Sequence, residues 1–348
     1  YVAPGNGGTS QNIPISVDDI DALANFAQEK SCFTIVGPEA PLANGLVDKF
    51  TEKGLAIFGP SKQAAQLESS KIWAKEFMKR NDIPTADFEI FDDAQKAKEF
   101  VSTYEKQVVI KADGLAAGKG VIVCDNNDEA NDAIDKILVK KEFGDAGSKI
   151  IIEERIDGIE ASYIALCDGQ VGIPMATSQD HKRAYDDDKG PNTGGMGAYS
   201  PTPVIDDKLG SVIQEEIIGK TISSMTKEGI EFRGFLYAGI MIRDGRPYVL
   251  EYNVRMGDPE CQPILMRLDS DLYKYLKASS EGKLNDLPKL SWKNESAVCI
   301  VLASNGYPNS YPKGDEIIVY PISPKILLFF MQEQKMKMEK LSQMVVVF

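Results

Sequence analysis

Several features that mark particular protein classes are scarce in this chain. The 348 residues include a single histidine and five cysteines with no CxxC pair, so neither a zinc site nor a disulfide framework is indicated. No apolar run approaches membrane-spanning length. No charged-then-apolar leader opens the chain, although Tyr1 is not an initiator methionine and an upstream piece is expected. We therefore expect a protein of a reducing compartment, the cytoplasm.

Positive charge is also scarce. The chain has 39 lysines and arginines against 52 acids, for a net charge of −13. Nucleic acids and membrane surfaces require a basic field, so neither is an expected partner. Negative ligands must be held by local groups instead.

The order of helical and strand-like segments predicts an α/β first part and a β-rich second part. The ranges 13–30 (capped by Ser16) and 45–53 read as helices, and 32–42 and 55–58 as strands, which is typical of a parallel sheet with ligands at its strand ends. Helices are further expected over 62–81, 93–104, 206–229 and 269–282. A hairpin turning at Asp244-Gly245 is expected between the last two of these helices.

The segment VVIKADGLAAGKGVIV, residues 108–123, is the most informative one. A β-branched strand ends in Lys111, and a glycine-rich turn with Lys119 leads to a second strand. Glycines permit close approach of the backbone to an anion, and lysines supply compact positive charge. The pattern favours a lid over phosphate groups, and its alternative is a glycine-rich hairpin with solvated lysines.

A second segment, VLEYNVRMGDPECQ, ends the predicted hairpin. Glu251 and Asn253 are two residues apart and project from the same face of a strand. A carboxylate and an amide oxygen, completed by phosphate oxygens, suit magnesium bound with a nucleotide. Arg255 adds a planar fork for a carboxylate or phosphate. The alternative is an edge strand with its polar residues in solvent.

Two further segments give weaker signals. In KIIIEERIDGIE, backbone groups of residues 154–156 could read an adenine edge and Glu160 could accept from a ribose, although acids beside a turn are more often solvated. The range 178–201 is polar and glycine-rich, and we predict a long functional loop there. Its histidine, His181, is interpreted as structural or orienting.

Four segments together resemble a known family. They are YVAPGNGG, KADGLAAGKGV, QDHKRAYDDDKGPNTGGMGAYSP and EYNVRMGDPECQ, in the order in which that family carries them. The resemblance is to phosphoribosylamine-glycine ligases (glycinamide ribonucleotide synthetases), ATP-grasp enzymes of purine synthesis, and covers residues 1 to about 322. It implies that ATP converts glycine to glycyl phosphate, which 5-phosphoribosylamine then attacks to give glycinamide ribonucleotide.

The resemblance also implies roles for individual residues. Contacts with ATP are implied for Lys71, Lys111, Glu153, Glu154, Arg155, Ile156, Glu160, Lys182 and Asn192. Contacts with glycine or phosphoribosylamine are implied for Asn6, Gly7, Glu39, Asp180, Gly194, Gly195, Arg255 and Asp258, with Lys182 and Asn192 beside them. Lys111, Arg255 and Asp180 are the expected catalytic residues. Mg²⁺ or Mn²⁺ is expected at Glu251 and Asn253.

The implied fold is mixed α/β and α+β: a Rossmann-like parallel-sheet domain (1–69) followed by an ATP-grasp domain (70–290) whose lid spans about 84–156. Residues 291–325 would begin a C-terminal domain. The family's first βα unit is missing ahead of Tyr1. The tail 326–348 has no family counterpart, and a shifted reading frame permitting FHAGTKNENGKIVTNGGRV is our hypothesis for it.

The sequence is also compatible with two alternative functions. One is a different ATP-grasp carboxylate-amine ligase, and the other is a fragment that binds ATP without turnover. The sequence stretches AAQLESSK and GFLYAGIM resemble those of eukaryotic members of the family. In eukaryotes this ligase is often fused to other purine-pathway domains, so a fused full-length protein is one expectation.

Overall fold

The computed structural model describes residues 1–115, 120–187, 189–312 and 314. These residues form two compact units. The first contains Tyr1–Cys32 and the described residues from Leu302 onward, and the second is Phe33–Val301. Lys119 of the predicted lid and the tail 326–348 lie outside the described residues. Within the described ranges, no helix has both the length and the apolarity to cross a membrane. The predicted domain limits at 69/70 and 290/291 stay a prediction.

The first unit contains α1 (Ile20–Lys30), which begins later than the sequence suggested. Asp19 caps the helix, because its side chain accepts a hydrogen bond from the amide of Ala22. The predicted cap Ser16 instead accepts from the amide of Asp18 at 3.3 Å. The prediction of Ser16 was therefore wrong, since a second cap residue stands closer to the apolar positions.

The second unit opens with a short parallel pair, β1 (Thr34–Ile35) and β2 (Ile57–Phe58). This confirms the expected parallel α/β start. The predicted strand 32–42 is wrong beyond Ile35, because α2 (Glu39–Asn44) follows Pro38 directly. Next come α3 (Leu46–Glu52) and α4 (Gln66–Ser69). Pro at the position before α2 suits the start of a helix better than the middle of a strand.

The predicted helix 62–81 is broken in two. Ser70 adopts an extended conformation between α4 and α5 (Lys71–Arg80), and its side chain accepts from the amide of Trp73. The carboxylate of Asp113 also accepts from the amide of Ile72 at 3.2 Å and from the Ser70 hydroxyl at 3.1 Å. These caps give α5 its own N-terminus, with Lys71 in its first turn.

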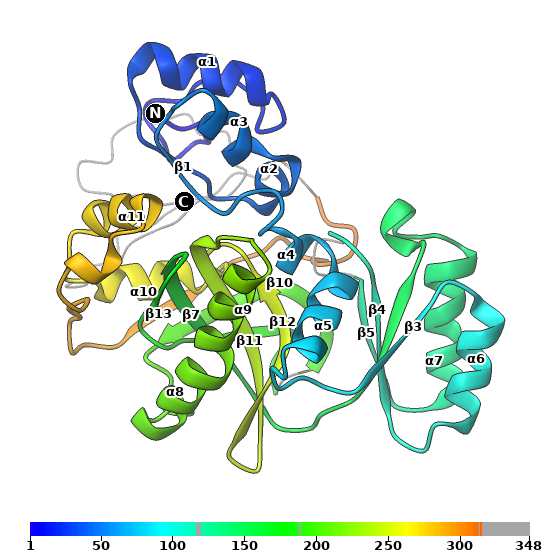
Figure 1. Cartoon of the computed structure of the whole chain (residues 1–348). Helices are drawn as coiled ribbons and strands as arrows, with labels where there is room; N and C mark the ends of the chain where they lie inside the picture. The colour runs from blue at the N-terminus through cyan, green and yellow to red at the C-terminus, as the bar shows by residue number, and fades with distance from the viewer. Residues whose placement is uncertain (116–119, 188, 313, 315–348) are drawn as a thin grey trace. The chain divides into compact units, whose positions relative to one another are not determined.

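An antiparallel sheet of four strands, in the order β3-β6-β4-β5, forms the predicted lid region. Its members are β3 (Phe88–Phe91), β4 (Val108–Ala112), β5 (Val121–Cys124) and β6 (Ile150–Glu154). Helices α6 (Ala94–Thr103) and α7 (Asn127–Ile134) pack beside each other on it, with a π-helical turn over Asp135–Val139 continuing α7 (Figure 1). Apolar side chains from Ala97 to Ile152 form the core between these layers.

A second antiparallel sheet, β12-β11-β7-β8, carries the predicted hairpin. Its strands are β7 (Ile159–Asp168), β8 (Gly172–Pro174), β11 (Arg233–Arg243) and β12 (Arg246–Asn253). The two faces of β7 contact different helices. Leu166 lies in the core formed with α11 (Leu272–Glu281), whereas Tyr163 donates to Gln214 in the helix formed by α8 (Asp207–Ile213), a π-helical stretch and α9 (Lys220–Lys227).

The third sheet, β13-β10-β9, corrects a prediction. The range 178–201 was expected to be a long loop, yet β9 (Gln179–Tyr185) and β10 (Lys189–Ser200) pair across most of it. β13 (Ala297–Ile300) adds to β10, and α10 (Cys261–Arg267) contacts both. Two register shifts accommodate the glycines of β10. Backbone pairing on both edges of β10 explains why a sequence with few β-forming residues still forms a strand.

Candidate functional site

The end of β12 places two oxygen donors on one face of the sheet. Glu251 and Asn253 oppose Gly239 and Tyr237 of β11, so their side chains share a face. The pairing shifts between Gly239 and Ile240, which leaves Leu250 as an extra residue on β12. Such a bulge re-aims backbone groups and is common beside functional sites.

Four positive charges act on the carboxylate of Glu251: those of Lys182, Lys71, Lys111 and Arg255. Burial alone would raise the pKa of Glu251, but these charges hold it below its ordinary value. Glu251 is thus ionised at neutral pH. An ionised carboxylate next to an amide oxygen fits Mg²⁺ or Mn²⁺ when phosphate oxygens complete the shell. Glu251 and Asn253 could therefore hold the expected metal, although the described residues contain no cluster of three acidic, histidine or cysteine side chains suited to one.

Lys111 reaches this site from the lid strand β4. Its ammonium group donates to the carbonyl oxygen of Leu250 at 2.9 Å and lies 3.1 Å from the Glu153 carboxylate. The bulge in β12 is what presents this carbonyl, since Leu250 has no partner on β11. The structure thus brings together the predicted lid lysine and the strand that carries Glu251. This is the juxtaposition on which the predicted ATP site depends.

Lys71 approaches from the N-terminus of α5. Its ammonium group donates to the carbonyl oxygen of Gly114 at 3.4 Å. Asp113, the residue before this glycine, caps the same helix. The turn that follows β4 is therefore bound to the first turn of α5. Lys71 is partly exposed and contributes to the positive field around Glu251.

Three charged side chains form an open cluster on β9 and β7: Glu160, Asp180 and Lys182. The ammonium group of Lys182 lies 3.8 Å from Glu160 and 3.9 Å from Asp180. Burial raises the pKa of Asp180 to about 6, and Lys182 opposes that shift. Burial also raises the pKa of Glu160. For Lys182 burial acts to lower the pKa, but the neighbouring acids, Glu160 first, raise it above its usual value.

One glycine of β10, Gly195, lies against the turn that follows β12. Gly195 has φ +127°, and a Cβ placed there would lie 2.5 Å from Cδ of Pro259 and 3.0 Å from the carbonyl oxygen of Asp258. Only glycine fits this approach. Gly194 precedes it, and Asn192 pairs with Arg183 of β9. Predicted substrate residues from two distant segments, Gly195 and Asp258, therefore lie in contact.

Arg255 is fixed by two acids. Its guanidinium lies 3.3 Å from Glu39 at the start of α2 and 3.1 Å from Glu68 in α4. Glu68 was not predicted. Its carboxylate also accepts from the amide of Val254 at 2.8 Å, and burial raises the pKa of Glu68 to about 7. Because Val254 stands between Asn253 and Arg255, Glu68 holds the backbone that carries both.

The residues predicted to hold adenosine, 153–156 and Glu160, differ in their burial and in their contacts. The Glu153 side chain is buried between Lys111 and Lys75, and its predicted contact with ATP stays a prediction. The amides of Glu154 and Arg155 donate to the carbonyls of Asp87 and Gln107, both at 2.9 Å. The Arg155 side chain pairs with Asp125 and Asp157. Ile156 is buried, and Glu160 belongs to the open cluster.

Other predicted residues fall elsewhere. Asn6 and Gly7 belong to the first unit, where the Asn6 side chain accepts from the amide of Gly8 at 2.9 Å. His181 is exposed on β9 opposite Gly197, and its interpretation as structural or orienting stays a prediction.

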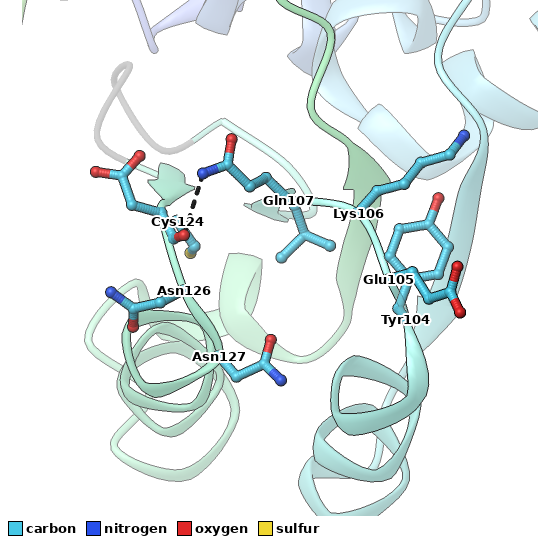
Figure 2. Close-up of a pocket in the computed structure, with 9 residues that line it drawn as sticks. Tyr104, Glu105, Lys106, Gln107, Cys124, Asn126 and Asn127 are labelled. Atoms are coloured by element: carbon cyan, nitrogen blue, oxygen red, sulfur yellow. Dashed lines mark hydrogen bonds between the residues drawn. The ribbon is translucent and has the colours of Figure 1, made fainter.

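A hollow of about 270 Å³ lies at the other end of the lid sheet, lined by Tyr104–Val108 and Cys124–Asn127 (Figure 2). The Gln107 side chain donates across it to the Asp125 carbonyl at 3.1 Å. It contains none of the predicted site residues. Lys111 lies three residues further along β4, toward the turn that meets α5. The chemistry is therefore assigned to the residues around Glu251 and not to this hollow.

Comparisons with known proteins match two family models to the chain. The phosphoribosylglycinamide synthetase N domain matches residues 1–68, and the phosphoribosylglycinamide synthetase ATP-grasp (A) domain matches residues 69–261. A phosphoribosylamine--glycine ligase of Ralstonia nicotianae is 52% identical over 328 residues, which cover 92% of this chain and 77% of that protein.

Solved structures agree with the family models. The crystal structure of a Thermotoga maritima phosphoribosylamine--glycine ligase superposes with a TM-score of 0.74 at 34% identity, covering 89% of this chain and 76% of that one. A biotin carboxylase of Campylobacter jejuni gives a TM-score of 0.63 at 19% identity, covering 80% of this chain and 61% of that one, and shows the fold alone. The predicted ATP-grasp fold is confirmed. The chain thus belongs to the phosphoribosylglycinamide synthetase family and is an ATP-grasp ligase.

Proposed function

We propose that this chain uses ATP to join glycine to 5-phosphoribosylamine, forming glycinamide ribonucleotide, ADP and phosphate, as in purine biosynthesis. The observation that carries the proposal is the convergence on Glu251 of positive charge from α5, β4, β9 and the turn after β12. A triphosphate with its divalent ion matches such an arrangement, because phosphoryl transfer is catalysed mainly by positioning and charge neutralisation.

In the first step, a carboxylate oxygen of glycine attacks the γ-phosphorus of ATP and ADP leaves. Lys111 and Lys71 would bind phosphate oxygens and neutralise the charge that develops on them, which their contacts with the Leu250 and Gly114 carbonyls beside the Glu251 strand and the lid turn support. A divalent ion, Mg²⁺ or Mn²⁺, held by Glu251 and Asn253 would supply further neutralisation. The lid turn bound to α5 would keep water from the acyl phosphate.

In the second step, the amine of phosphoribosylamine attacks the carbonyl carbon of glycyl phosphate, phosphate leaves and the nitrogen loses a proton. We assign the proton to the carboxylate of Asp180, whose pKa of about 6 suits a general base near neutral pH. Arg255, oriented by Glu39 and Glu68, would bind a carboxylate or phosphate of the substrates.

The remaining assignments follow the family resemblance and stay predictions. Residues 153–156, through backbone groups of 154–156, and the side chain of Glu160 would hold adenosine. Lys182, Asn192, Gly194, Gly195 and Asp258 would line the substrate pocket, and Asn6, Gly7 and Glu39 would contact phosphoribosylamine. We also place the protein in the cytoplasm, because all five cysteines are free thiols.

The proposal is tested by substrate-dependent release of ADP. Glycine together with phosphoribosylamine should trigger it, whereas bicarbonate should not. Glu251→Gln should reduce metal-dependent ADP formation by at least about a hundredfold, while Asp244→Asn, at the exposed turn of the same hairpin, should leave it unchanged. Equal activity of both variants would remove Glu251 from the site.

A second candidate is a protein that binds ATP without turnover. The match covers 77% of the length of the Ralstonia relative. Saturable binding of ATP with no product from glycine and phosphoribosylamine would favour this candidate.

A further inference from the structure

Helix α5 carries a second lysine whose place is unusual. Lys75 lies one turn after Lys71, among Ala74, Phe77 and Met78 on the buried face of the helix. Its side chain is 3% exposed. Lysine is almost never fully buried unless its charge has a partner, so the contacts of Lys75 require an explanation.

That partner is the carboxylate of Glu153, which Lys75 shares with Lys111. A single oxygen of Glu153, Oε2, lies 3.0 Å from Nζ of Lys75 and 3.1 Å from Nζ of Lys111. The side chains of Glu153 and Lys111 are 2% and 6% exposed. The buried triad, defined as Lys75, Glu153 and Lys111, thus joins α5 to strands β6 and β4 of the lid sheet.

A further contact fixes Lys75 against β12. Its ammonium group donates to the hydroxyl of Thr85 at 2.7 Å, and that hydroxyl donates to the carbonyl of Val249 at 2.7 Å. Val249 immediately precedes Leu250, whose carbonyl accepts from Lys111. Both lysines are therefore bound to Glu153 at one end and to adjacent carbonyls of β12, directly or through Thr85, at the other.

The buried triad carries two positive charges and one negative charge, which leaves an excess of one. Burial is the main cause that lowers the pKa of Lys75 to about 8, and the charge of Lys111 adds to the shift. The second oxygen of Glu153, Oε1, is buried without a hydrogen-bond partner among the described residues. The triad itself contains one acid for two lysines, and Lys111, whose charge also acts on the carboxylate of Glu251, is its member bound to the carbonyl of Leu250.

We propose that Lys75 is a positioning residue for ATP, acting through Lys111. By sharing Glu153 it prevents Lys111 from forming a neutral one-to-one ion pair, and the excess charge is left for a phosphate group. The inference rests on the proposed function, namely that Lys111 binds ATP phosphates. Without Lys75, the carboxylate of Glu153 would be satisfied by Lys111 alone, and a phosphate would have to compete with it.

The test compares Lys75→Met with Lys79→Met, since Lys79 is exposed one turn later on the same helix. We expect Lys75→Met to weaken ATP binding about tenfold and to raise KM for ATP more than it lowers kcat. The affinity for adenosine, which has no phosphate, should not change. A merely structural role would reduce the affinities for ATP and adenosine together.

A double-variant cycle identifies the route of the effect. In a Lys111→Met background, Lys75→Met should weaken ATP binding by less than about twofold, because its effect passes through Lys111. Additive losses would overturn the inference. A Lys111→Met variant that binds ATP normally would instead contradict the proposed function, so the two failures are distinguishable.

The unaltered protein gives an independent reading by NMR titration of isotope-labelled lysines. Lys75 is faced by Glu153, by Lys111 and, at longer range, by Asp87. Bound phosphate beside Lys111 should move the titration of Lys75 to higher pH while that of exposed Lys79 stays unchanged. An unmoved Lys75 titration at saturating ATP would overturn the inference even if no Lys75 variant folds.

Discussion

Two groups of charged residues lie near Glu251, and they differ in the solvent exposure of their side chains and in the length of their ion-pair contacts. The buried triad has side chains exposed by 6% or less and contacts of 3.0 and 3.1 Å. The open cluster, Glu160, Asp180 and Lys182, has contacts of 3.8 and 3.9 Å, and two of its side chains are exposed by 32% and 42%. Both groups combine lysine with acid, yet only the second has side chains that are partly exposed.

This difference suggests separate tasks for the two groups. In the buried triad a charge that loses its partner cannot be solvated, so the triad sets geometry, and removal of one of its charges should destabilise the fold. The open cluster keeps Glu160 and Lys182 partly exposed, so water screens their charges more than those of the triad. The value of the open cluster lies in contacts with ligands. Variants of the two groups should therefore separate stability from activity.

The largest effect is expected from Glu153→Gln. Removing this carboxylate leaves two buried ammonium groups without a counter-charge, which should lower the free energy of unfolding by about 3–5 kcal/mol. Glu154→Gln on the same strand is the control, because the partners of Glu154 are the more exposed Lys106 and Arg243; it should cost less than about 1 kcal/mol. Denaturant unfolding measures both, and equal losses would contradict the distinction.

The next effect concerns the open cluster. Lys182→Met should reduce kcat/KM by a factor of about 10²–10³, as the loss of a charged transition-state contact does. The free energy of unfolding should change by less than about 1 kcal/mol. Lys189→Met, on the same hairpin and exposed, serves as the control for both measurements. A loss of stability as large as that of Glu153→Gln would show that the cluster is structural.

The pH dependence of stability sharpens the comparison. The pKa of Lys75 is about 8 in the folded protein and near its usual 10.5 when unfolded, so the unfolded chain binds more protons between these values. Stability should then rise with pH across this window relative to Lys75→Met, by up to about 3 kcal/mol in total. Unfolding curves at pH 8, 9 and 10 measure the difference. If the stability of the unaltered protein and that of Lys75→Met changed with pH in the same way, the charge of Lys75 would not be buried as the structure indicates.

The smallest effect is expected in the pH profile of activity. Protonation of Asp180, with its pKa of about 6, removes the proposed base, so kcat/KM should fall about tenfold per unit as pH drops below 6. Asp180→Asn should be slow and lack this limb. Rates under constant ionic strength test it, and an unchanged limb in the variant would assign the titration to another group.

The sequence predicted those parts of the site whose pattern is local. Alternation along β12 placed Glu251 and Asn253 on one face, and β-branched residues around Lys111 predicted the strand that carries it. The glycine and aspartate at 244–245 predicted the hairpin turn, which the structure confirms. In each case the spacing of a few neighbouring residues determines the geometry.

Parts of the site that depend on distant contacts were not predicted. Glu153 and Glu68 were not recognised as ion-pair partners, because Lys75 and Arg255 are far from them in sequence. The pairing of β9 with β10 was missed, since polar and glycine residues have low strand propensity and only register and edge pairing stabilise them. Lys75 did leave a signal, namely a lysine among apolar positions of α5.

A crystal structure with Mn²⁺ and a non-hydrolysable ATP analogue, with the metal located by anomalous scattering, would show directly whether Glu251 and Lys111 hold the nucleotide. We expect the metal about 2.1 Å from a carboxylate oxygen of Glu251, with phosphate oxygens within hydrogen-bond distance of Nζ of Lys111. A nucleotide bound in the hollow of Figure 2, or a metal away from Glu251, would contradict this expectation.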